Sequence, residues 1–522
     1  MSLHSRFFAT ARRCWNQLAI ADSTGQKLTY GRALTAVLLF AKQIRKRTEG
    51  ERMVGLLLPA SAGGALANIA TLAAGRVPVN LNFTAGEDSM AVAIGRCGIR
   101  TIITSKKFLE KVGITLKPTP QGSPSTALVF LEDIRAAVGL LDKITAAVEA
   151  KAMPVSALER RYGPVGNDQA LATVIFSSGS TGTPKGVMLS HRNILSNIDG
   201  FADIFPMTAD DCFIGVLPFF HSFGLTGTLW FPMLSGCAVA FHPNPMDAKV
   251  VGELAETYKA TMLIATPTFI NAYMRRCTKE QFANLHHVIV GAEKLRPSLA
   301  EAFSAQYGIE LTEGYGCTEM SPVVAVNTAH AGVPNPSKPG SVGRPVKGVF
   351  AKIVSQHTGE GPLIDQEGLL LVRGESLMLG YLGEPERTAE AIRDGWYQTG
   401  DIASIDSNGF ITITDRLSRF SKIAGEMVPH LKIEDAINDV LGEAASAVTS
   451  VPDDARGERI IAFYTKPDVT SAQIWEGISQ SSLPKLWLPR RDNIYYIDAL
   501  PTLGSGKLDL RALRELALKT SS

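Results

Sequence analysis

The sequence lacks the features that mark several large classes of protein. Its 522 residues include only six cysteines, none spaced as Cys-x-x-Cys, and no cluster of histidines accompanies them. That scarcity argues against a disulfide scaffold and a zinc site, and it fits a reducing cytoplasm. The formal net charge is only +2, so no strong positive field indicates nucleic acid as a partner. Internal repeats and low-complexity tracts are also missing.

Long uninterrupted apolar runs are absent as well. The segments 53–75 and 213–246 carry almost no charge, but prolines and small polar residues interrupt both. A membrane-spanning helix needs about 20 mostly apolar residues in continuous helix, so we expect buried strand–helix units instead. The first 21 residues are basic and aromatic. We expect an opening helix whose aromatic side chains pack on the domain, and contact with the inner face of a membrane is the alternative left open.

Short apolar runs alternate with helix-like segments through the first two thirds of the chain. Each run is followed by Gly, Ser, Thr or Pro, and the clearest ones are 172–176, 262–265 and 287–290. This alternation predicts two mostly parallel α/β subdomains, with functional loops at the carboxyl ends of the strands. A chain of this length also exceeds one compact core, so more than one domain is expected.

The texture of the sequence changes twice in the last third. From about Val333 a stretch rich in Pro, Gly and Ser leads into strand-like runs that predict a small β-barrel-like subdomain, at 350–354, 369–372 and 410–413. After Asp415 and Arg416 a helix-like run and two strand-like runs follow, at 431–441, 460–464 and 494–497. We therefore predict a domain 1–415 and a small, mobile α+β domain 416–522.

A loop of small and hydroxylated residues directly after the apolar run 172–176 carries the strongest chemical signal. It reads Ser177, Ser178, Gly179, Ser180, Thr181, Gly182, Thr183, Pro184, Lys185 and Gly186. Small residues let backbone N–H groups approach phosphate oxygens, hydroxyls add donors, and the lysine adds positive charge. The Gly-Lys-Ser/Thr order of a Walker loop is missing. We expect a strand, this phosphate-binding loop and then a helix.

The loop and four later motifs resemble the adenylate-forming superfamily, in the same order along nearly the whole chain. That superfamily holds acyl-CoA synthetases, peptide-synthetase adenylation domains and firefly luciferase. The later motifs are Gly291-Ala292-Glu293, Glu313-Gly314-Tyr315-Gly316-Cys317-Thr318-Glu319, Tyr397-Gln398-Thr399-Gly400-Asp401 with Asp415-Arg416, and Pro501–Lys507. The resemblance implies that the chain uses ATP and Mg²⁺ to convert a carboxylic acid into an acyl-adenylate.

The resemblance also assigns a role to each motif. Gly291, Ala292, Glu293, Glu313, Gly314 and Gly316 would flank the nucleotide. Tyr315 offers a flat face for adenine stacking, and Thr318 a donor for the α-phosphate. Glu319 offers a hard oxygen ligand for Mg²⁺. Asp401 can accept both ribose hydroxyls, and Arg416 can reach ribose or phosphate.

The resemblance implies that two lysines serve the two half-reactions. Lys507 follows a Gly/Ser turn and would stabilise charge as the carboxylate attacks the α-phosphate. Lys422, with Gly425, matches the stretch that serves the later attack by a thiol, after the small domain has swung. The hinge position falls on Ser418, where many relatives carry Asp or Lys.

The acid and the acceptor are expected from the segment 213–242 and from finer motifs. With His221 near its mouth, this segment suggests a tunnel for a fatty acid. Ordinary core packing is the alternative, and we expect most of its large apolar residues to be core, namely Phe219, Phe220, Phe223, Leu225, Trp230 and Phe231. The motifs 218–224, 242–249, 291–295 and 416–430 resemble the acyl-ACP synthetase branch. Medium- or long-chain fatty acid and acyl carrier protein are therefore the expected partners, with CoA as the alternative acceptor.

Two further expectations concern partners and rival functions. Bifunctional relatives carry an acyltransferase domain for which this chain has no room, which leaves open a separate acyltransferase partner. An aromatic-acid adenylase and a catalytically inactive nucleotide-binding regulatory module are the alternatives. The inactive module predicts erosion at key positions, yet Glu319, Asp401, Arg416 and Lys507 are all present.

Overall fold

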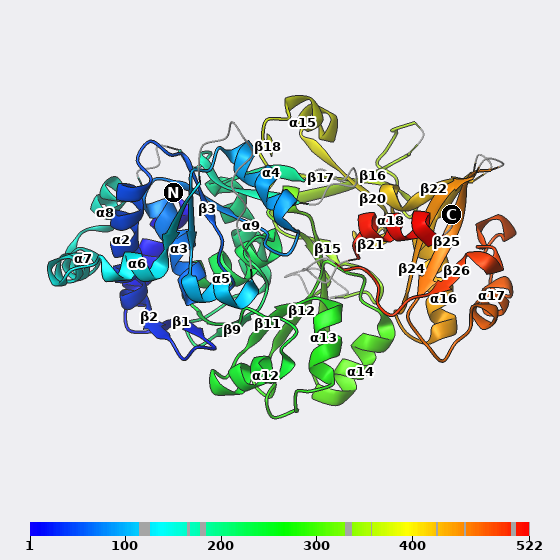
Figure 1. Cartoon of the computed structure of the whole chain (residues 1–522), viewed down its shortest axis with the longest axis horizontal. Helices are drawn as coiled ribbons and strands as arrows, with labels where there is room; N and C mark the ends of the chain where they lie inside the picture. Colours follow the sequence, from blue (N-terminus) through cyan, green and yellow to red (C-terminus); the bar gives the residue numbers. More distant parts are fainter. Residues whose placement is uncertain are drawn as a thin grey trace.

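The computed structural model describes residues 1–113, 126–163, 167–177, 184–328, 337–356, 358–423, 426–453, 456–502 and 508–520. Within them the fold is α/β, with a large N-terminal part built on parallel sheets and a smaller C-terminal part beside it (Figure 1). The predicted fold class is confirmed.

A nine-stranded sheet forms the centre of the large part. Its six inner strands run parallel, and its two ends are closed by antiparallel strands. In spatial order the strands are β15 (Arg344–Pro345), β14 (Val323–Val326), β13 (Leu311–Gly316), β12 (His287–Val290), β11 (Met262–Ala265), β9 (Cys212–Gly215), β10 (Ala238–Phe241), β1 (Leu18–Asp22) and β2 (Lys27–Thr29). The runs predicted at 262–265 and 287–290 are β11 and β12, and both are almost fully buried because helices cover both faces.

Crossover helices connect the strands of this sheet. They are α10 (Ser222–Gly224), α11 (Phe231–Ser235), α12 (Ala248–Thr257), α13 (Pro267–Met274) and α14 (Pro297–Tyr307), and α9 (His191–Ile204) leads into β9 from outside this sheet. Between α10 and α11, residues Leu225–Trp230 form a wider π-type turn. The segment 213–246 is therefore a strand, a broken helix and a second strand, as the interrupting prolines predict.

A second sheet of four parallel strands lies in the first part of the chain. Its order is β4 (Val77–Asn80), β3 (Met53–Leu56), β5 (Thr101–Thr104) and β6 (Ala127–Phe130). It is connected by α3 (Ala62–Ala73), α4 (Glu87–Cys97) and α5 (Lys106–Val112), and α6 (Leu131–Ala136) follows its last strand. The two sheets correspond to the two predicted α/β subdomains.

The segment after the phosphate loop differs from the prediction. We expected a helix, but β7 (Leu171–Ser177) and β8 (Lys185–Ser190) pair as antiparallel strands, and β18 (Gly380–Tyr381) adds to β8. Val187 and Leu189 are fully buried on one side of β8. This short alternating run suits a strand, and the helix α9 begins only after Ser190 caps it.

The predicted β subdomain is present. It is an antiparallel sheet of β16 (Val349–Val354), β17 (Gly368–Gly374), β20 (Trp396–Ile405) and β19 (Ile392–Arg393), in that order. β21 (Ile411–Arg416) pairs with the later half of β20, and α15 (Pro385–Ala391) lies nearby.

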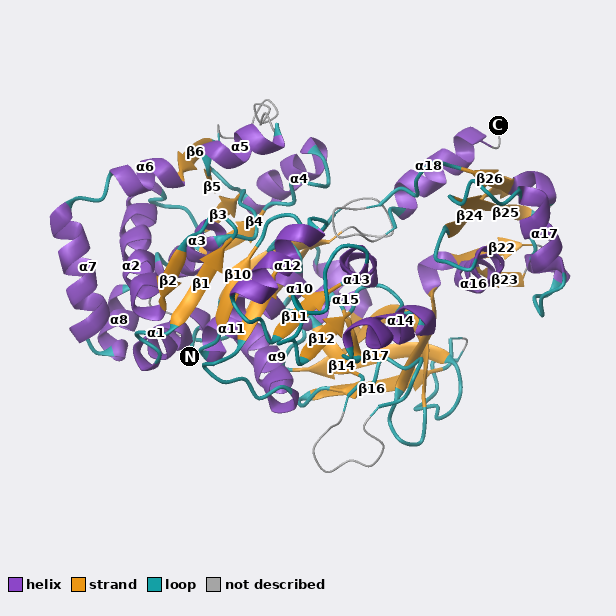
Figure 2. Cartoon of the chain, turned by 90° about the horizontal axis from the view of Figure 1, so that it is seen from below, coloured by secondary structure: helices purple, strands orange, loops and turns teal. Residues whose placement is uncertain are grey.

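The C-terminal part has a hydrophobic core of its own. A hairpin of β22 (Phe420–Ile423) and β23 (Glu426–Pro429) lies beside a sheet of β24 (Ser446–Asp453), β25 (Gly457–Tyr464) and β26 (Ile494–Tyr496). Three helices pack there: α16 (His430–Leu441), α17 (Ser471–Ser479) and α18 (Leu510–Thr520). Figure 2 shows this part set apart from the rest of the chain.

Helices gather at the opposite end of the molecule, where the chain begins. They are α1 (Leu3–Arg13), α2 (Tyr30–Arg47), α7 (Leu140–Ala152) and α8 (Val155–Arg161) (Figures 1 and 2). Phe7 and Phe8 on α1 are fully buried, so the expected packing of the N-terminal aromatics is confirmed for this pair. Among the described residues no helix is long and apolar enough to cross a membrane.

Candidate active site

The two ends of the phosphate loop are fixed by the β7–β8 pair. Ser177 lies opposite Lys185 in the register, while Ser178, Gly179, Ser180, Thr181 and Gly182 lie outside the described residues. The Lys185 ammonium lies 5.1 Å from the centre of the Tyr381 ring. Burial lowers the pKa of Lys185, and nearby Arg387 and Arg416 act in the same direction, whereas Glu319 opposes them.

Glu319 is the buried carboxylate of the site. It lies in the 3₁₀ turn Thr318–Met320 and is only 7% exposed. The hydroxyl of Tyr381, brought in by β18, donates to its Oε1 at 2.9 Å. Its neighbour Thr318 accepts a hydrogen bond from the Ser222 hydroxyl at 3.3 Å. The turn therefore presents a carboxylate and a hydroxyl that other elements hold in place.

Tyr315 near the end of β13, Asp401 in the middle of β20 and Arg416 at the end of β21 come together. The Tyr315 hydroxyl donates to Asp401 Oδ2, and Arg416 Nε lies 3.2 Å from Asp401 Oδ1. The β20–β21 register places Asp401 directly opposite Arg416. Attraction to Asp401 raises the pKa of Arg416, which keeps the guanidinium charged. The sequence predicted all three side chains at the nucleotide but not that they bind one another.

The loop after β12 lines the pocket with its backbone and small residues rather than with large side chains. Gly291 and Ala292 line the main pocket, and Ala292 has a positive φ of 71°. Glu293 instead turns away, because its Oε2 accepts hydrogen bonds from the backbone and hydroxyl of Thr268 at the start of α13. Glu293 does not line this pocket, and its expected place beside the nucleotide stays a prediction.

The β13 strand contributes two glycines and a tyrosine to the pocket wall. Gly314, Tyr315 and Gly316 line it, and a Cβ at Gly316 would lie only 2.2 Å from the Pro322 carbonyl oxygen, so no larger residue fits there. Glu313, in the same motif, faces elsewhere: its Oε1 accepts from the Leu295 N–H at 3.2 Å. Burial raises the pKa of Glu313 to about 7.

These elements surround a pocket that holds about 830 Å³ of space, part of it open to solvent. Its polar side carries Ser222, Thr318 and His221. Its apolar side is formed by aromatic and aliphatic side chains, namely Phe201, Leu217, Phe223, Phe269, Ile289, Val323 and Val326. The pocket thus joins the glycine-lined wall of β13 to an apolar floor.

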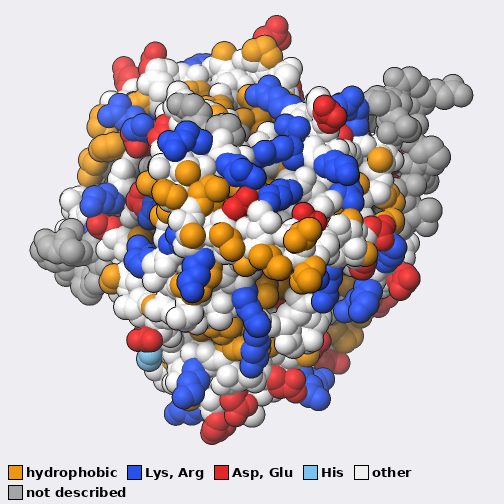
Figure 3. All heavy atoms as spheres, turned by 90° about the vertical axis from the view of Figure 1, so that its left-hand side faces the viewer, with side chains coloured by type: hydrophobic (Ala, Val, Ile, Leu, Met, Phe, Trp, Pro, Cys, Tyr) orange, Lys and Arg blue, Asp and Glu red, His pale blue; other side chains and the backbone are white. Residues whose placement is uncertain are grey.

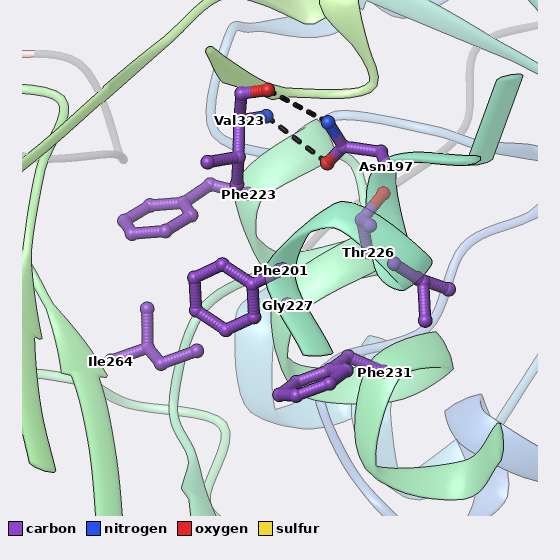
Figure 4. Close-up of a pocket in the computed structure, with 9 residues that line it drawn as sticks. Asn197, Phe201, Phe223, Thr226, Gly227, Phe231, Ile264 and Val323 are labelled. Carbon is purple, nitrogen blue, oxygen red and sulfur yellow. Dashed lines mark hydrogen bonds between the residues drawn. The ribbon is translucent and has the colours of Figure 1, made fainter. Parts of the chain in front are cut away.

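Most of the six large apolar residues of the segment 213–242 are core residues, as expected. Phe223 lines the main pocket, and Phe231 lines a smaller cavity beyond it that holds about 260 Å³ of space, part of it open to solvent. The other four are core residues that are at most 2% exposed, namely Phe219, Phe220, Leu225 and Trp230. Figure 4 shows Phe223, Phe201 and Ile264 approaching one another around the smaller cavity. Phe201, Phe223 and Val323 line both spaces, so these side chains separate them.

Asn197 on α9 is a positioning residue that the sequence did not reveal. Its side chain donates to the carbonyls of Val323 at 2.7 Å and Met320 at 3.2 Å, and accepts from the Val323 N–H at 3.1 Å (Figure 4). It thereby ties α9 to the segment that carries Glu319. A buried asparagine in an amphipathic helix is a weak signal, because its partners lie more than 120 residues away.

Of the residues expected from the C-terminal part, those that the structure describes do not line the pocket. Lys422 lies on β22 with an exposed side chain, and its backbone N–H donates to Glu458. Ser418 falls in the 3₁₀ turn Leu417–Arg419. Lys507 and Gly425 lie outside the described residues. The roles of Lys422 and Lys507 stay predictions.

The charges of the site fit a magnesium–nucleotide ligand. Besides burial, Arg387 and Arg416 lower the pKa of Lys185, whereas Glu319 opposes them. Glu319 and Asp401 are both buried carboxylates. A polyphosphate would relieve the repulsion that the two arginines exert on Lys185, and a hard oxygen of Glu319 suits Mg²⁺. Asp401 beside the flat Tyr315 adds an acceptor that suits ribose hydroxyls.

Comparison with known proteins agrees with this geometry. The model of the AMP-binding enzyme family matches residues 7–382. The chain is 31% identical over 477 residues to 4-coumarate–CoA ligase 5 of Oryza sativa subsp. japonica, covering 88% of this chain and 84% of that protein. The relatives found this way are CoA ligases, so the narrower resemblance to acyl-ACP synthetases is not what the comparison supports.

Solved structures give the same result for the fold. An ATP-bound RpMatB–BxBclM chimera superposes with a TM-score of 0.82 at 25% identity, covering 99% of this chain and 100% of the other. The o-succinylbenzoate CoA synthetase of Bacillus subtilis, in complex with ATP and a magnesium ion, gives a TM-score of 0.79 at 20% identity, covering 98% and 99%. Both likenesses extend over the small C-terminal part.

Proposed function

Because the chain belongs to the AMP-binding enzyme family, whose cofactors are ATP and Mg²⁺, we propose that it is an acid–CoA ligase. It activates a compact, largely apolar carboxylic acid and passes the acyl group to CoA. The relatives at 31% and 28% identity that span most of the chain are 4-coumarate–CoA ligases, which supports CoA over a carrier protein as the acceptor.

The shape of the pocket carries the proposal. Its apolar side is lined by Phe201, Phe223 and Phe269. These three rings bound a short aromatic pocket rather than a long tunnel. A planar aromatic acid or a short aliphatic acid fits such a box, since ring faces and edges pack well on aromatic walls. Its carboxylate would then point toward Thr318 and His221 on the polar side.

The residues fall into roles that follow from their charges. In the first half-reaction a carboxylate oxygen bonds to the α-phosphorus of ATP and pyrophosphate leaves. Lys185 and Arg416 offset phosphate charge, and Glu319 would hold Mg²⁺, which supplies further charge neutralisation when bound. Asp401 would accept from the ribose, releasing Tyr315 for contact with adenine. Lys507 would approach from the C-terminal domain, whose boundary we place between 415 and 416.

In the second half-reaction the thiol sulfur bonds to the acyl carbon, AMP leaves, and the thiol proton passes to solvent or a nearby base. Lys422 is proposed to serve this step after the C-terminal domain has turned. A salt bridge of 2.8 Å between Lys294 and Asp435 links the large domain to α16, so this contact would break and re-form during the turn. Both partners are well exposed, and such pairs contribute about 0–1 kcal/mol, which suits a reversible latch.

Fatty acid with acyl carrier protein is the second candidate, favoured by the sequence from Arg416 to His430. One experiment separates the two. The protein is incubated with Mg-ATP and a panel of cinnamic, benzoic and medium- to long-chain fatty acids, with CoA, holo carrier protein or neither. Pyrophosphate release and thioester mass are then measured. The proposal predicts aromatic or short acyl-CoA products, and fatty acyl thioesters on the carrier protein alone would overturn it.

A variant of the pocket wall sharpens this test. Phe223 separates the main pocket from the smaller cavity, so Phe223→Ala should join them and shift the preferred acid toward longer chains. Phe303 is a buried phenylalanine on α14 that lines neither space, and Phe303→Ala is the matched control. If both variants lose stability and neither changes its preferred acid, Phe223 does not bound the acyl pocket.

A further inference from the structure

Helix α7 presents an apolar stripe to solvent. Leu140, Leu141, Ile144 and Val148 are 73%, 80%, 53% and 58% exposed. At about 100° per residue these four positions span an arc of only about 100°, so they form one face of the helix. Ala146 and Ala150 on the opposite face are fully buried. The stripe is thus the outer surface of a helix that is already packed on its other side.

The surroundings of this stripe are strongly basic. Helices α2, α7 and α8 together carry nine lysines and arginines and three acidic residues, a net charge of +6 in a chain whose total is +2. One of the three acids, Glu149, is buried and paired with Lys42 and Arg161. Figure 3 shows this face: lysine and arginine side chains are spread across it, with apolar side chains gathered between them.

We propose that this face, defined by the α7 stripe and the basic side chains of α2, α7 and α8, docks the protein on an anionic lipid surface. Apolar side chains on one face of a helix enter the boundary between headgroups and acyl chains, while lysines and arginines beside them bind anionic headgroups. Lys151 lies on the same side of α7 as the stripe, and Lys143 flanks it, so the two interactions act together.

The charge of the face selects this occupant over a second copy of the chain. A two-fold symmetric dimer would bring the same patch of both copies together, which places one +6 surface against another. Like charges facing each other across an interface oppose association, whereas an anionic membrane attracts them. Phe7 and Phe8 of the N-terminal helix do not supply the apolar contact, because both are buried.

The test is co-sedimentation of the full chain with lipid vesicles. Vesicles of phosphatidylcholine alone are compared with vesicles in which about 30% of the lipid is phosphatidylserine, at about 0.1 M salt. The protein should pellet with the second set only, and pelleting should weaken as the salt concentration rises. Equal behaviour with the two sets of vesicles would overturn the proposal.

Two pairs of variants test the two halves of the face. Leu141→Ser with Ile144→Ser should lower the partition coefficient at least about tenfold. Lys143→Glu with Lys151→Glu should lower it by about 25-fold or more, since each basic side chain near an anionic surface contributes about fivefold. Acid-dependent ATP–pyrophosphate exchange should stay unchanged in both, which shows that the fold is intact.

A control pair of substitutions removes exposed apolar side chains from a different surface of the protein. Phe350→Ser with Ile364→Ser removes two apolar side chains that are 56% and 50% exposed on the β subdomain, and should leave vesicle binding unchanged. If the control weakens binding as much as the stripe variant does, the face is not specific. If the wild type is a dimer that Leu141→Ser with Ile144→Ser dissociates, and it does not pellet, the face is a self-association surface and the lipid proposal fails.

Discussion

The hydrogen bond between Tyr381 and Glu319 offers the sharpest test of the metal-binding role. Glu319 is 7% exposed and Tyr381 3% exposed, so water cannot easily replace the hydroxyl that donates to Oε1 at 2.9 Å. Tyr381→Phe removes this donor and keeps the ring under Lys185. A hydrogen bond to a charged acceptor contributes about 1.5–3 kcal/mol. If the misplaced carboxylate binds Mg²⁺ about 2 kcal/mol more weakly, the affinity for Mg²⁺ falls by about 30-fold.

The assay is ATP–pyrophosphate exchange as a function of Mg²⁺ concentration. In Tyr381→Phe the Mg²⁺ concentration for half-maximal exchange should rise by about 10–30-fold. Tyr273→Phe is the control, because its hydroxyl donates to the Pro245 carbonyl at 2.8 Å in the core of the same domain. The control should lower stability without changing the Mg²⁺ requirement. A Tyr381→Phe enzyme with the wild-type Mg²⁺ requirement would refute the reasoning.

Three further predictions follow from the site. Asp401→Asn removes the charge beside Arg416 and should raise the KM for ATP by about tenfold or more in the exchange assay. Glu313→Gln should remove a pH dependence of stability: the folded carboxyl has a pKa of about 7 against 4.5 unfolded, so wild-type stability falls as pH rises between those values. Denaturant titrations should therefore show the variant gaining stability relative to the wild type at pH 8 but not at pH 4, and a constant difference contradicts this. Lys507→Ala should slow exchange by about 10²–10³-fold yet keep thioester formation from supplied acyl-adenylate, and equal loss of both would contradict the division between the lysines.

The sequence predicted the strands whose signal is local. The runs at 262–265 and 287–290 are apolar, short and bounded by Thr, Gly or His, and they match β11 and β12 residue for residue. The run at 185–190 was misjudged, because it is only six residues long and leads directly into α9. A local pattern of that length does not distinguish a strand from the first turns of a helix.

The same limit explains which parts of the site were foreseen. Motif order placed Tyr315, Thr318, Glu319 and Asp401 at one site, and the first three lie on one strand and the turn after it. The contacts between motifs were not foreseen. Glu293 turning to Thr268 depends on tertiary packing that no single motif encodes.

The central claim is that the protein makes an acyl-adenylate. The most direct measurement is the exchange of labelled pyrophosphate into ATP, with Mg²⁺ present, CoA omitted and the acids supplied one at a time. We predict exchange that depends on a compact aromatic or short aliphatic acid and falls to background in Glu319→Gln. No exchange with any acid in the panel, by protein that is folded and binds ATP, would contradict the account.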